Sequence, residues 1–167
     1  MLLCARKDFV TFINMKLVQV DLNLENHCTS LISLLNEYMK DEMGIGEALP
    51  VELAPYIIEG LKKHSAYIGF FVEYEQRFIA LANCNLNYST WKAKFIINIH
   101  DFIVHPEFRN KGIGEFLLEG IKNYAINKGY CKLNLEVRED NTKAKKLYRK
   151  VGFAPGKGPM LFWELEF

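Results

Sequence analysis

Hydrophobic and polar positions follow two different periods along the second half of this chain, and the change of period marks the predicted elements. Residues 95–104 form a nearly continuous apolar run, which is typical of a strand buried on both faces. Apolar residues then recur at the i, i+4, i+8 spacing of an amphipathic helix, at positions 113, 117, 118, 121 and 125. The pattern therefore predicts a buried strand, a short turn and a helix.

The same analysis of the rest of the chain predicts an alternating order of strands and helices. Strands are expected at 16–21, 67–74, 77–86, 132–137 and 159–167, and helices at 24–40, 51–63 and 141–151. The two residues Glu75-Gln76 predict a hairpin turn between two of these strands. The complete order is β-α-α-β-β-β-α-β-α-β, without an internal repeat or a low-complexity linker.

The chain is long enough for one domain with a core of its own. It has 167 residues, half of them apolar, so a single compact domain is the expectation. Met15 directly precedes the first predicted strand. We therefore predict a domain over 15–167, preceded by an N-terminal extension over 1–14.

Charge and cysteine usage exclude several classes of partner and site. Lys and Arg number 21 against 20 Asp and Glu, a balance that argues against nucleic acid or an anionic membrane as the main partner. The four cysteines, Cys4, Cys28, Cys84 and Cys131, have no C-x-x-C spacing and are expected to be reduced. No apolar run reaches the ~18 residues of a membrane helix. These features predict a cytoplasmic protein without a metal site.

The turn between the buried strand and its helix carries the chemistry of a phosphate site. Residues 106–114 read PEFRNKGIG, with two cationic side chains and two glycines at a helix start. Helix N-termini present free backbone N–H groups and a positive dipole to an anion, and glycines allow close approach. Neither the dinucleotide fingerprint nor the P-loop motif fits, because Leu117 occupies the position where each needs another residue.

This turn resembles a known acyl-CoA-binding motif, R/Q-x-x-G-x-G/A, of the GCN5-related N-acetyltransferase (GNAT) superfamily. The matching residues are Arg109, Asn110, Lys111, Gly112, Ile113 and Gly114. Further along, LEVR-x-x-N at 135–141 and A-x-x-L-Y-x-x-x-G-F at 144–153 resemble the second signature of the superfamily in type, order and spacing. The resemblance is close over residues 94–154, and elsewhere it extends to the order of the elements.

The resemblance implies a fold, a cofactor and a reaction. The implied fold is α/β (α+β), a mixed, mostly antiparallel sheet of six to seven strands flanked by about four helices, with strands splayed at the acyl-CoA site. The implied reaction is transfer of an acetyl group from acetyl-CoA to a primary amine by direct attack, without a metal. Besides the 109–114 turn, the resemblance assigns to the cofactor the backbone of Phe102, Ile103 and Val104 and the side chain of Asn141, which could equally cap a helix.

Three residues are candidates for acid and base catalysis. By resemblance, Tyr148 protonates the departing thiolate. His100 is the preferred base, because imidazole titrates near neutrality and His100 shares strand parity with Phe102 and Val104. Glu136 is the rival base. Asp101 has the opposite parity, so it could face the same cleft as His100 only across a β-bulge.

The acceptor is less specified by the sequence. Acidic residues between the first two predicted helices, with two aromatic residues, could receive a cationic amine or be an ordinary solvated loop; they are Asp41, Glu42, Glu47, Tyr56 and Trp91. A small-molecule amine is the preferred acceptor. A protein N-terminus or lysine is an alternative, as is a non-catalytic acyl-CoA-binding module, and a homodimer stays open.

Overall fold

The computed structural model describes residues 14–156, 158 and 163–167. Over this part the chain forms one five-stranded sheet in the order β1-β2-β3-β4-β5. Strands β1 to β4 are antiparallel to their neighbours and β5 is parallel to β4. The strands are β1 (Lys16–Gln19), β2 (Tyr67–Tyr74), β3 (Arg77–Ser89), β4 (Lys94–Val104) and β5 (Lys132–Leu135).

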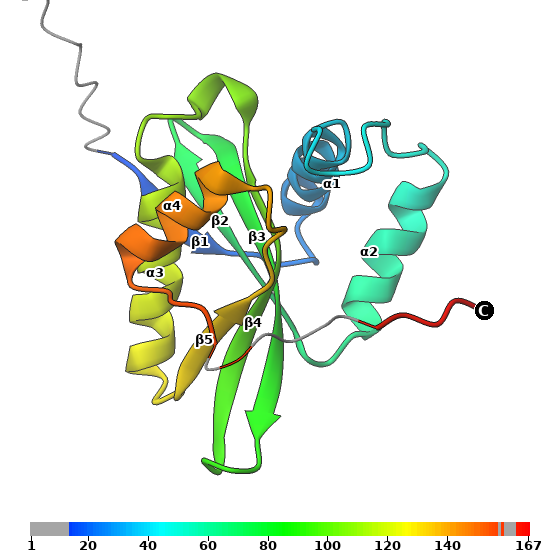
Figure 1. Ribbon diagram of the computed structural model, residues 1–167. Helices are drawn as coiled ribbons and strands as arrows, with labels where there is room; N and C mark the ends of the chain where they lie inside the picture. The colour runs from blue at the N-terminus through cyan, green and yellow to red at the C-terminus, as the bar shows by residue number, and fades with distance from the viewer. Residues whose placement is uncertain (1–13, 157, 159–162) are drawn as a thin grey trace, which may run out of the picture.

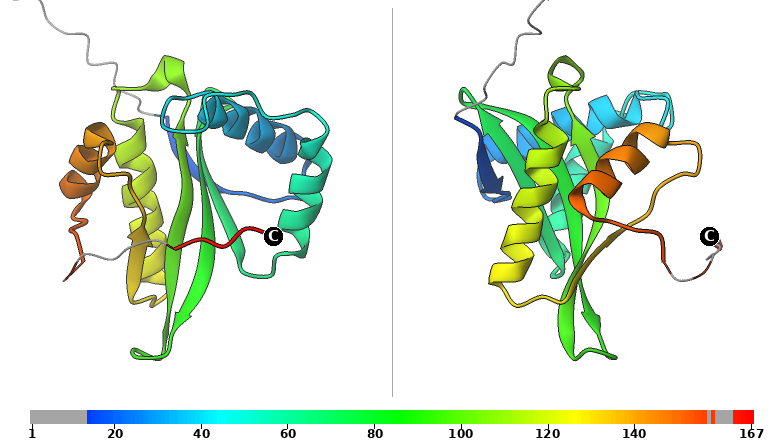
Figure 2. Two further views of the ribbon diagram at one scale, coloured as in Figure 1. Left: turned by 45° about the vertical axis from the view of Figure 1, so that its right-hand side comes forward. Right: turned by 60° about the vertical axis from the view of Figure 1, so that its left-hand side comes forward.

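Helices cover both faces of this sheet. Helices α1 and α2 lie on one face, and α3 and α4 lie on the other (Figures 1 and 2). Their bounds are α1 (Glu25–Met39), α2 (Leu53–Lys63), α3 (Ile113–Asn127) and α4 (Thr142–Val151), and a single 3₁₀ turn, η1 (Pro106–Phe108), follows β4. The predicted α/β class, with a mostly antiparallel sheet and four helices, is confirmed.

Two separate cores hold these layers together because strand side chains alternate between the faces. Phe70 and Val72 of β2 pack with Leu117, Leu118 and other residues of α3. The alternate residue Phe71 packs with Leu31 of α1 on the opposite face. The sheet is therefore buried on both sides, as the long apolar run in β4 predicted.

The last predicted strand is the main difference between the expected and observed elements. Its residues 159–162 lie outside the described part, and residues 163–167 are not in a strand. The side chains of Trp163, Leu165 and Phe167 are exposed there. The alternation of apolar residues predicted a strand, but these side chains do not pack against the core. The sheet of the described residues thus has five strands instead of the predicted six to seven.

Strands β4 and β5 diverge halfway along β4. They pair only between Ile96–Ile99 and Lys132–Leu135. Beyond Ile99, β4 continues to Val104 and stays paired with β3, whereas β5 ends. The edge of β4 that faced β5 therefore has no neighbouring strand from Phe102 to Val104, which agrees with the predicted splay.

A β-bulge interrupts β4 at His100. Asn83 of β3 pairs with Asp101, but the next residue, Cys84, pairs with Ile99, which leaves His100 as the extra residue. Ile99 packs on the α3 side, whereas Ile103 packs on the α1 side. Strand parity therefore changes at the bulge, and the parity argument that joined His100 to Phe102 and Val104 was wrong.

The proposed N-terminal extension falls almost entirely on residues 1–13, which are outside the described part. The division into an extension and a domain over 15–167 stays a prediction. Within the described ranges, none of the helices combines the length and apolar character needed to cross a membrane.

Candidate active site

A large cleft lies where β4 and β5 diverge. It is bordered by the second half of β4, the 109–114 turn, the segment after β5 and helix α4. Its volume of about 1750 Å³ exceeds the roughly 300–1,000 Å³ of ordinary small-molecule sites. The predicted site residues that line it are Phe102, Ile103, Val104, Arg109, Asn110, Gly112, Ile113, Gly114, Asn141, Tyr148, His100 and Glu136. The cleft has room for a long cofactor together with an acceptor.

The turn that enters α3 presents an uncapped helix N-terminus to this cleft. Gly112 is the N-cap and no side chain bonds to the first N–H groups of the helix. Asn110 also has a positive φ of 61°, so the chain turns sharply between β4 and α3. Free N–H groups at a helix N-terminus are a general anion site, which suits a pyrophosphate.

Glycine is needed at two positions of the turn for different physical reasons. Gly112 has φ +82°, a left-handed conformation that favours glycine, and a Cβ there would meet nothing within 4 Å. Gly114 is a packing residue, since a Cβ on it would lie 3.0 Å from Leu147 of α4 and 3.5 Å from Phe102. Gly112 thus shapes the turn, and Gly114 lets α4 approach α3.

Arg109 does not point a free charge into the cleft. Its Nε donates to the carbonyl oxygen of Val104 at 3.0 Å, and its NH1 group lies 2.7 Å from the carboxylate of Asp41. Met43 N–H donates to the same carboxylate, and this bond, followed by the Arg109 guanidinium, holds the pKa of Asp41 below its usual range. Arg109 therefore ties the end of β4 to the α1–α2 connection.

Lys111 is the one predicted cofactor residue that does not line the cleft. Its ammonium lies over the ring of Phe108, 5.3 Å from the ring centroid. The ring is part of η1, and Arg77 approaches it as well, at 5.5 Å. Among the predicted contacts for a pyrophosphate, the cations Arg109 and Lys111 thus both have protein partners, and the helix N-terminus is the group that remains free to bind an anion.

Tyr148 lies at the inner wall of the cleft on α4. Its ring packs edge-to-face on Phe102, with ring centroids 6.2 Å apart, and against Phe153 at 5.9 Å. Burial, with a smaller effect of Tyr38, raises the pKa of Tyr148 to about 12. The hydroxyl therefore stays protonated at neutral pH, as a proton donor must.

His100 and Asp101, which strict alternation would point to opposite faces, are in contact because of the bulge. The Nδ1 atom of His100 lies 3.2 Å from Oδ1 of Asp101. The His100 side chain is 69% exposed and lines the cleft, whereas the Asp101 side chain is 22% exposed. Glu136 follows β5, lines the same cleft and is exposed. The structure thus brings the three possible bases to one region.

Asn141 has a structural role that the sequence left open. Its Oδ1 accepts a hydrogen bond from Ala144 N–H at 3.0 Å and so caps α4. At the other end of α4, Gly152 has φ +104° and serves as the C-cap. Asn141 also lines the cleft, so capping and a ligand contact are compatible.

Tyr38 is a cleft residue that the sequence placed only within the predicted helix at 24–40. It lines the cleft from α1, and burial, Asp101 and Asp41 together raise its pKa. It also contributes to the raised pKa of Tyr148. Tyr38 is therefore close enough to Asp41, Asp101 and Tyr148 to interact with them, a proximity that no local pattern could reveal.

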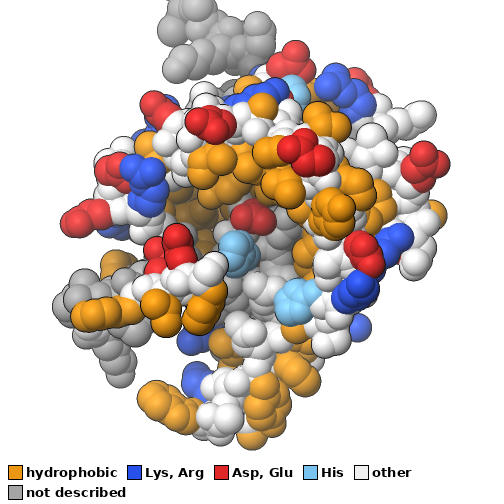
Figure 3. Space-filling view, turned by 90° about the vertical axis from the view of Figure 1, so that its right-hand side faces the viewer, with side chains coloured by type: hydrophobic (Ala, Val, Ile, Leu, Met, Phe, Trp, Pro, Cys, Tyr) orange, Lys and Arg blue, Asp and Glu red, His pale blue; other side chains and the backbone are white. Residues whose placement is uncertain are grey.

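The acceptor residues suggested by the sequence do not form one site. Asp41 is paired with Arg109, and Glu42 lines the cleft. Trp91 is 98% exposed at the tip of the β3–β4 hairpin, and Tyr56 is 70% exposed on α2. The α1–α2 side of the molecule is instead hollowed, and Figure 3 shows histidine and acidic side chains in the hollow with hydrophobic side chains at its rim.

Metal and thiol chemistry have little support in the described ranges. Over residues 14–156, 158 and 163–167, no group of three or more His, Cys, Asp or Glu side chains is placed to hold a metal ion. Cys28, Cys84 and Cys131 are free thiols, and burial raises the pKa of Cys84. A buried thiol of this kind is a poor nucleophile.

Strands β4 and β5 diverge beside the uncapped N-terminus of α3, and this arrangement leaves a cleft within the sheet. The model of the acetyltransferase (GNAT) family matches residues 29–153, and the chain belongs to this family. The superfamily predicted from the motifs is therefore confirmed.

Relatives and solved structures extend this comparison. A thialysine N-epsilon-acetyltransferase of Bos taurus is 38% identical over 66 residues, which are 40% of this chain and 38% of that protein. The chain thus matches well under half the length of such curated relatives. An aminoglycoside acetyltransferase from an uncultured soil metagenomic sample, in complex with trehalose, has a TM-score of 0.75 at 15% identity over 91% of this chain and 97% of that one.

A second solved structure contains a CoA derivative. AAC(6')-Iy in complex with the bisubstrate analogue CoA-S-monomethyl-acetylneamine has a TM-score of 0.71 at 16% identity, over 92% of this chain and 99% of that one. At these identities the structural matches show that the fold is shared.

Proposed function

We propose that this protein is an acetyl-CoA-dependent N-acetyltransferase that acts on a primary amine of a small molecule. The observation that carries the proposal is the single cleft that joins an uncapped helix N-terminus, an open strand edge and an acid–base set. Family membership supports the use of acetyl-CoA.

The cofactor is held mainly by backbone groups in this proposal. Its pyrophosphate binds the N–H groups at the start of α3, at Ile113 and Gly114. Its pantetheine amides pair with the open edge of β4 from Phe102 to Val104, as an added strand does. Asn141 and Asn110 line the cleft and are available for further polar contacts.

Acetyl transfer then needs one base and one acid. The ammonium group of the acceptor gives a proton to His100, and the neutral amine attacks the thioester carbonyl. A C–N bond forms, the C–S bond breaks, and the Tyr148 hydroxyl donates a proton to the departing sulfur. The second proton of the attacking nitrogen leaves as the amide forms and returns to the Tyr148 phenolate through water, and His100 then gives up its proton to solvent. The products are the acetamide and free CoA, with net release of one proton.

His100 is favoured over Glu136 as the base because its partner orients it. Asp101 accepts a hydrogen bond from one ring nitrogen, which leaves the other ring nitrogen to take the proton. Glu136 is exposed just beyond β5. Glu136 is therefore better suited to attract the cationic acceptor than to act as an oriented base.

The names of relatives point to the acceptor class. Among proteins similar to this chain are acetyltransferases named for thialysine and for streptothricin, which are amine-bearing small molecules. The hollow on the α1–α2 side has acidic and histidine side chains inside, and acidic side chains attract a cationic amine (Figure 3).

A screen for acceptor-dependent release of CoA tests this function. The purified chain is incubated with acetyl-CoA and with thialysine, lysine, streptothricin, an aminoglycoside or N-terminal and lysine peptides. We expect release of CoA and an acetylated product with a small amine. Acetylation of peptides alone would identify a protein acetyltransferase, and binding of acetyl-CoA in calorimetry without turnover of any acceptor would identify a non-catalytic binding module.

A further inference from the structure

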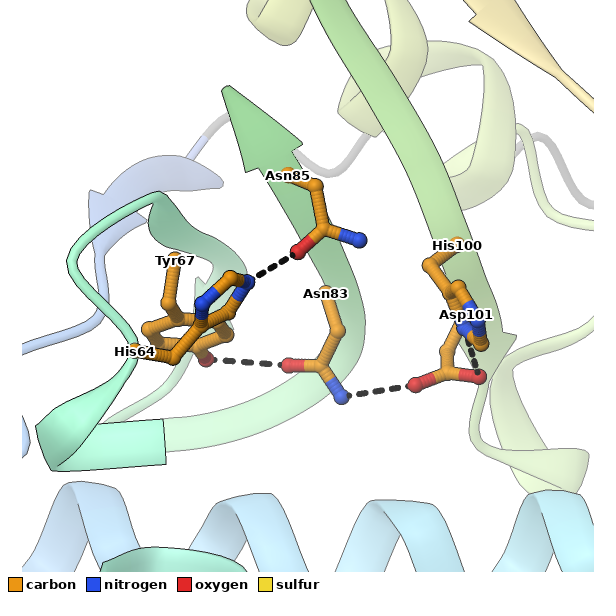
Figure 4. A network of polar contacts seen from close by, with 6 residues as sticks. All are labelled: His64, Tyr67, Asn83, Asn85, His100 and Asp101. Atoms are coloured by element: carbon orange, nitrogen blue, oxygen red, sulfur yellow. Dashed lines mark hydrogen bonds and ion pairs between the residues drawn. The ribbon is translucent and has the colours of Figure 1, made fainter. Parts of the chain in front are cut away.

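Polar side chains form a row across three strands on the α1 face of the sheet. Asn83 of β3 pairs in register with Gly69 of β2 on one side and with Asp101 of β4 on the other. Tyr67 donates from its hydroxyl to Oδ1 of Asn83 at 2.9 Å, and Nδ2 of Asn83 donates to Oδ2 of Asp101 at 3.0 Å (Figure 4). The row ends at His100, which lines the cleft.

Asn83 is a buried polar residue beside the hydrophobic core. It is 6% exposed, and its neighbours on the same face of β3 and β4 include Leu81 and Ile103 of the core. A buried amide costs free energy unless its groups are hydrogen-bonded. Both polar atoms of the Asn83 side chain are hydrogen-bonded, one to Tyr67 and the other to Asp101, and these two bonds offset the cost of burying the amide.

Glycine at position 69 makes room for the first member of the row. A Cβ on Gly69 would collide with the hydroxyl of Tyr67, which folds back along β2 over that glycine. The backbone of Gly69 is not in the left-handed region. A Cβ at this position would also lie 2.6 Å from Cγ2 of Val20, so glycine makes room both for that side chain and for the phenol that reaches across to Asn83.

These contacts fix the direction of each hydrogen bond. A carboxylate only accepts, so the amide of Asn83 must turn its NH₂ group to Asp101 and its oxygen to Tyr67. With one oxygen of Asp101 occupied, the other faces His100 Nδ1. A carboxylate at that place favours the ring tautomer with hydrogen on Nδ1, which leaves Nε2 as the acceptor.

We propose that Tyr67 and Asn83 are positioning residues that hold Asp101 so that it fixes His100 in the tautomer with Nε2 open for the acceptor's proton. The inference rests on the proposed function for the role of His100 as base. The row lies at the bulge, so the same irregularity that turns His100 to the cleft also sets Asp101 beside it.

Other ionisable groups surround this pair from each neighbouring element. Burial first, and Asp101 among the lesser causes, raises the pKa of Tyr38 from α1, of Tyr67 from β2 and of Cys84 from β3. The other charged or titratable groups that line the cleft are Asp41, Glu42, Arg109, Glu115, Glu136, Arg138, Asp140, Lys143, Lys146, Tyr148, Arg149 and Lys150. Among the described residues, Asp101 is the carboxylate that contacts His100.

Nitrogen-15 NMR of the histidine rings tests the inference without any substrate. At a pH where His100 is neutral, its two ring nitrogens have well-separated shifts, and a His100→Gln variant assigns its signals. We expect hydrogen mainly on Nδ1 in the wild type. In Tyr67→Phe and Asn83→Leu, the ratio of the Nδ1–H form to the Nε2–H form should fall severalfold.

Asn85→Leu is the matched control. Asn85 lies two residues along β3, and its Oδ1 is 2.8 Å from Nε2 of His64, outside the row (Figure 4). This variant should keep the wild-type tautomer of His100. Hydrogen mainly on Nε2 in the wild type, or an unchanged ratio in both Tyr67→Phe and Asn83→Leu, would overturn the proposal.

Kinetics with an accepted amine give the second readout. Tyr67→Phe removes a single oxygen and should lower kcat/KM for the amine about tenfold, with the acidic limb of its pH profile displaced to lower pH. The affinity for acetyl-CoA should not change. If no amine is acetylated, the proposed function fails while the tautomer measurement still decides the inference; if amines are acetylated and the profile of Tyr67→Phe equals that of the wild type, the positioning role is refuted.

Discussion

The Tyr148 side chain has two properties, the packing of its ring and a hydroxyl that can donate a proton. One substitution separates them. Tyr148→Phe keeps the ring contacts with Phe102 and Phe153 but removes the proton donor. We expect kcat to fall about 10²-fold or more, with little change in acetyl-CoA affinity, in steady-state assays of CoA release.

The control for this substitution is another tyrosine of the same core. Tyr124 of α3 packs edge-to-face on Phe70, with centroids 5.0 Å apart, and does not line the cleft. Tyr124→Phe should keep the wild-type kcat. Equal rates for Tyr148→Phe and wild type would mean that Tyr148 only packs or that acetyl transfer is not rate-limiting.

Asp41 predicts a particular response of stability to acid. Its native pKa lies below the ordinary value of 3.8 because Met43 N–H and Arg109 stabilise the carboxylate, so the native state binds fewer protons than the unfolded state. This stabilisation is complete above the ordinary value and is lost as pH falls through the native pKa. Asp41→Asn keeps an acceptor for Met43 but loses the ion pair, at a cost of about 1 kcal/mol near neutrality.

Denaturant unfolding at several pH values measures this effect. The difference between wild type and Asp41→Asn should be largest near neutral pH and should disappear in strong acid. The exposed pair of Asp140 with Arg138, also 2.7 Å apart, is the comparison, and Asp140→Asn should change stability less. A difference for Asp41→Asn that persists undiminished in strong acid would assign it to packing.

Single residues also show the limit of reading chemistry from a local motif. Arg109 was predicted to face a pyrophosphate from its place in R-x-x-G-x-G. That role stays a prediction, and the ion pair that Arg109 makes with Asp41, 68 positions away in the sequence, is beyond the reach of any motif. Gly114 is similar, because its close neighbour Leu147 belongs to another helix.

At the scale of elements, the start of α3 makes the strongest prediction about the cofactor. Gly112→Ala places a side chain in the left-handed region without a steric clash, so the fold should survive at a cost of about 1 to 2 kcal/mol. Relief of that strain should reorient the first N–H groups of the helix. We therefore expect clearly weaker acetyl-CoA binding in isothermal calorimetry.

The opposite end of the same helix supplies the control. Gly129 follows α3 and has φ +72°, and a Cβ added to it would likewise meet nothing within 4 Å. Gly129→Ala should lose similar stability and bind acetyl-CoA as the wild type does. Equal affinity in both variants would count against the helix N-terminus as the pyrophosphate site.

Elements with a long, regular pattern were the most predictable. The helix expected at 24–40 is observed as Glu25–Met39, and the strand at 67–74 is observed with those bounds. The bulge at His100 could be considered from the sequence but not placed, because it arises from pairing with Asn83 across the sheet. An alternating pattern at 163–167 gave no strand, since a strand also needs a neighbour.

At the scale of the whole molecule, the order of the elements from β1 to α4 and the position of the cleft followed from the sequence. Two motifs on either side of the β4–β5 divergence identified the family and most of the lining of the cleft. The row from Tyr67 to His100 could not be predicted, because its members come from three strands and are joined only in the folded sheet. Long-range polar contacts leave no periodic trace in a sequence.

The divergence of β4 from β5 has a consequence for how such a protein can change over evolutionary time. At Phe102, Ile103 and Val104 the open edge consists of peptide groups, which every residue except proline provides in full. The side chains at the same positions pack in the two cores and line the cleft. Mutations can therefore exchange one apolar side chain for another without altering the backbone edge. The sequence of this strand is then expected to diverge faster than its backbone structure.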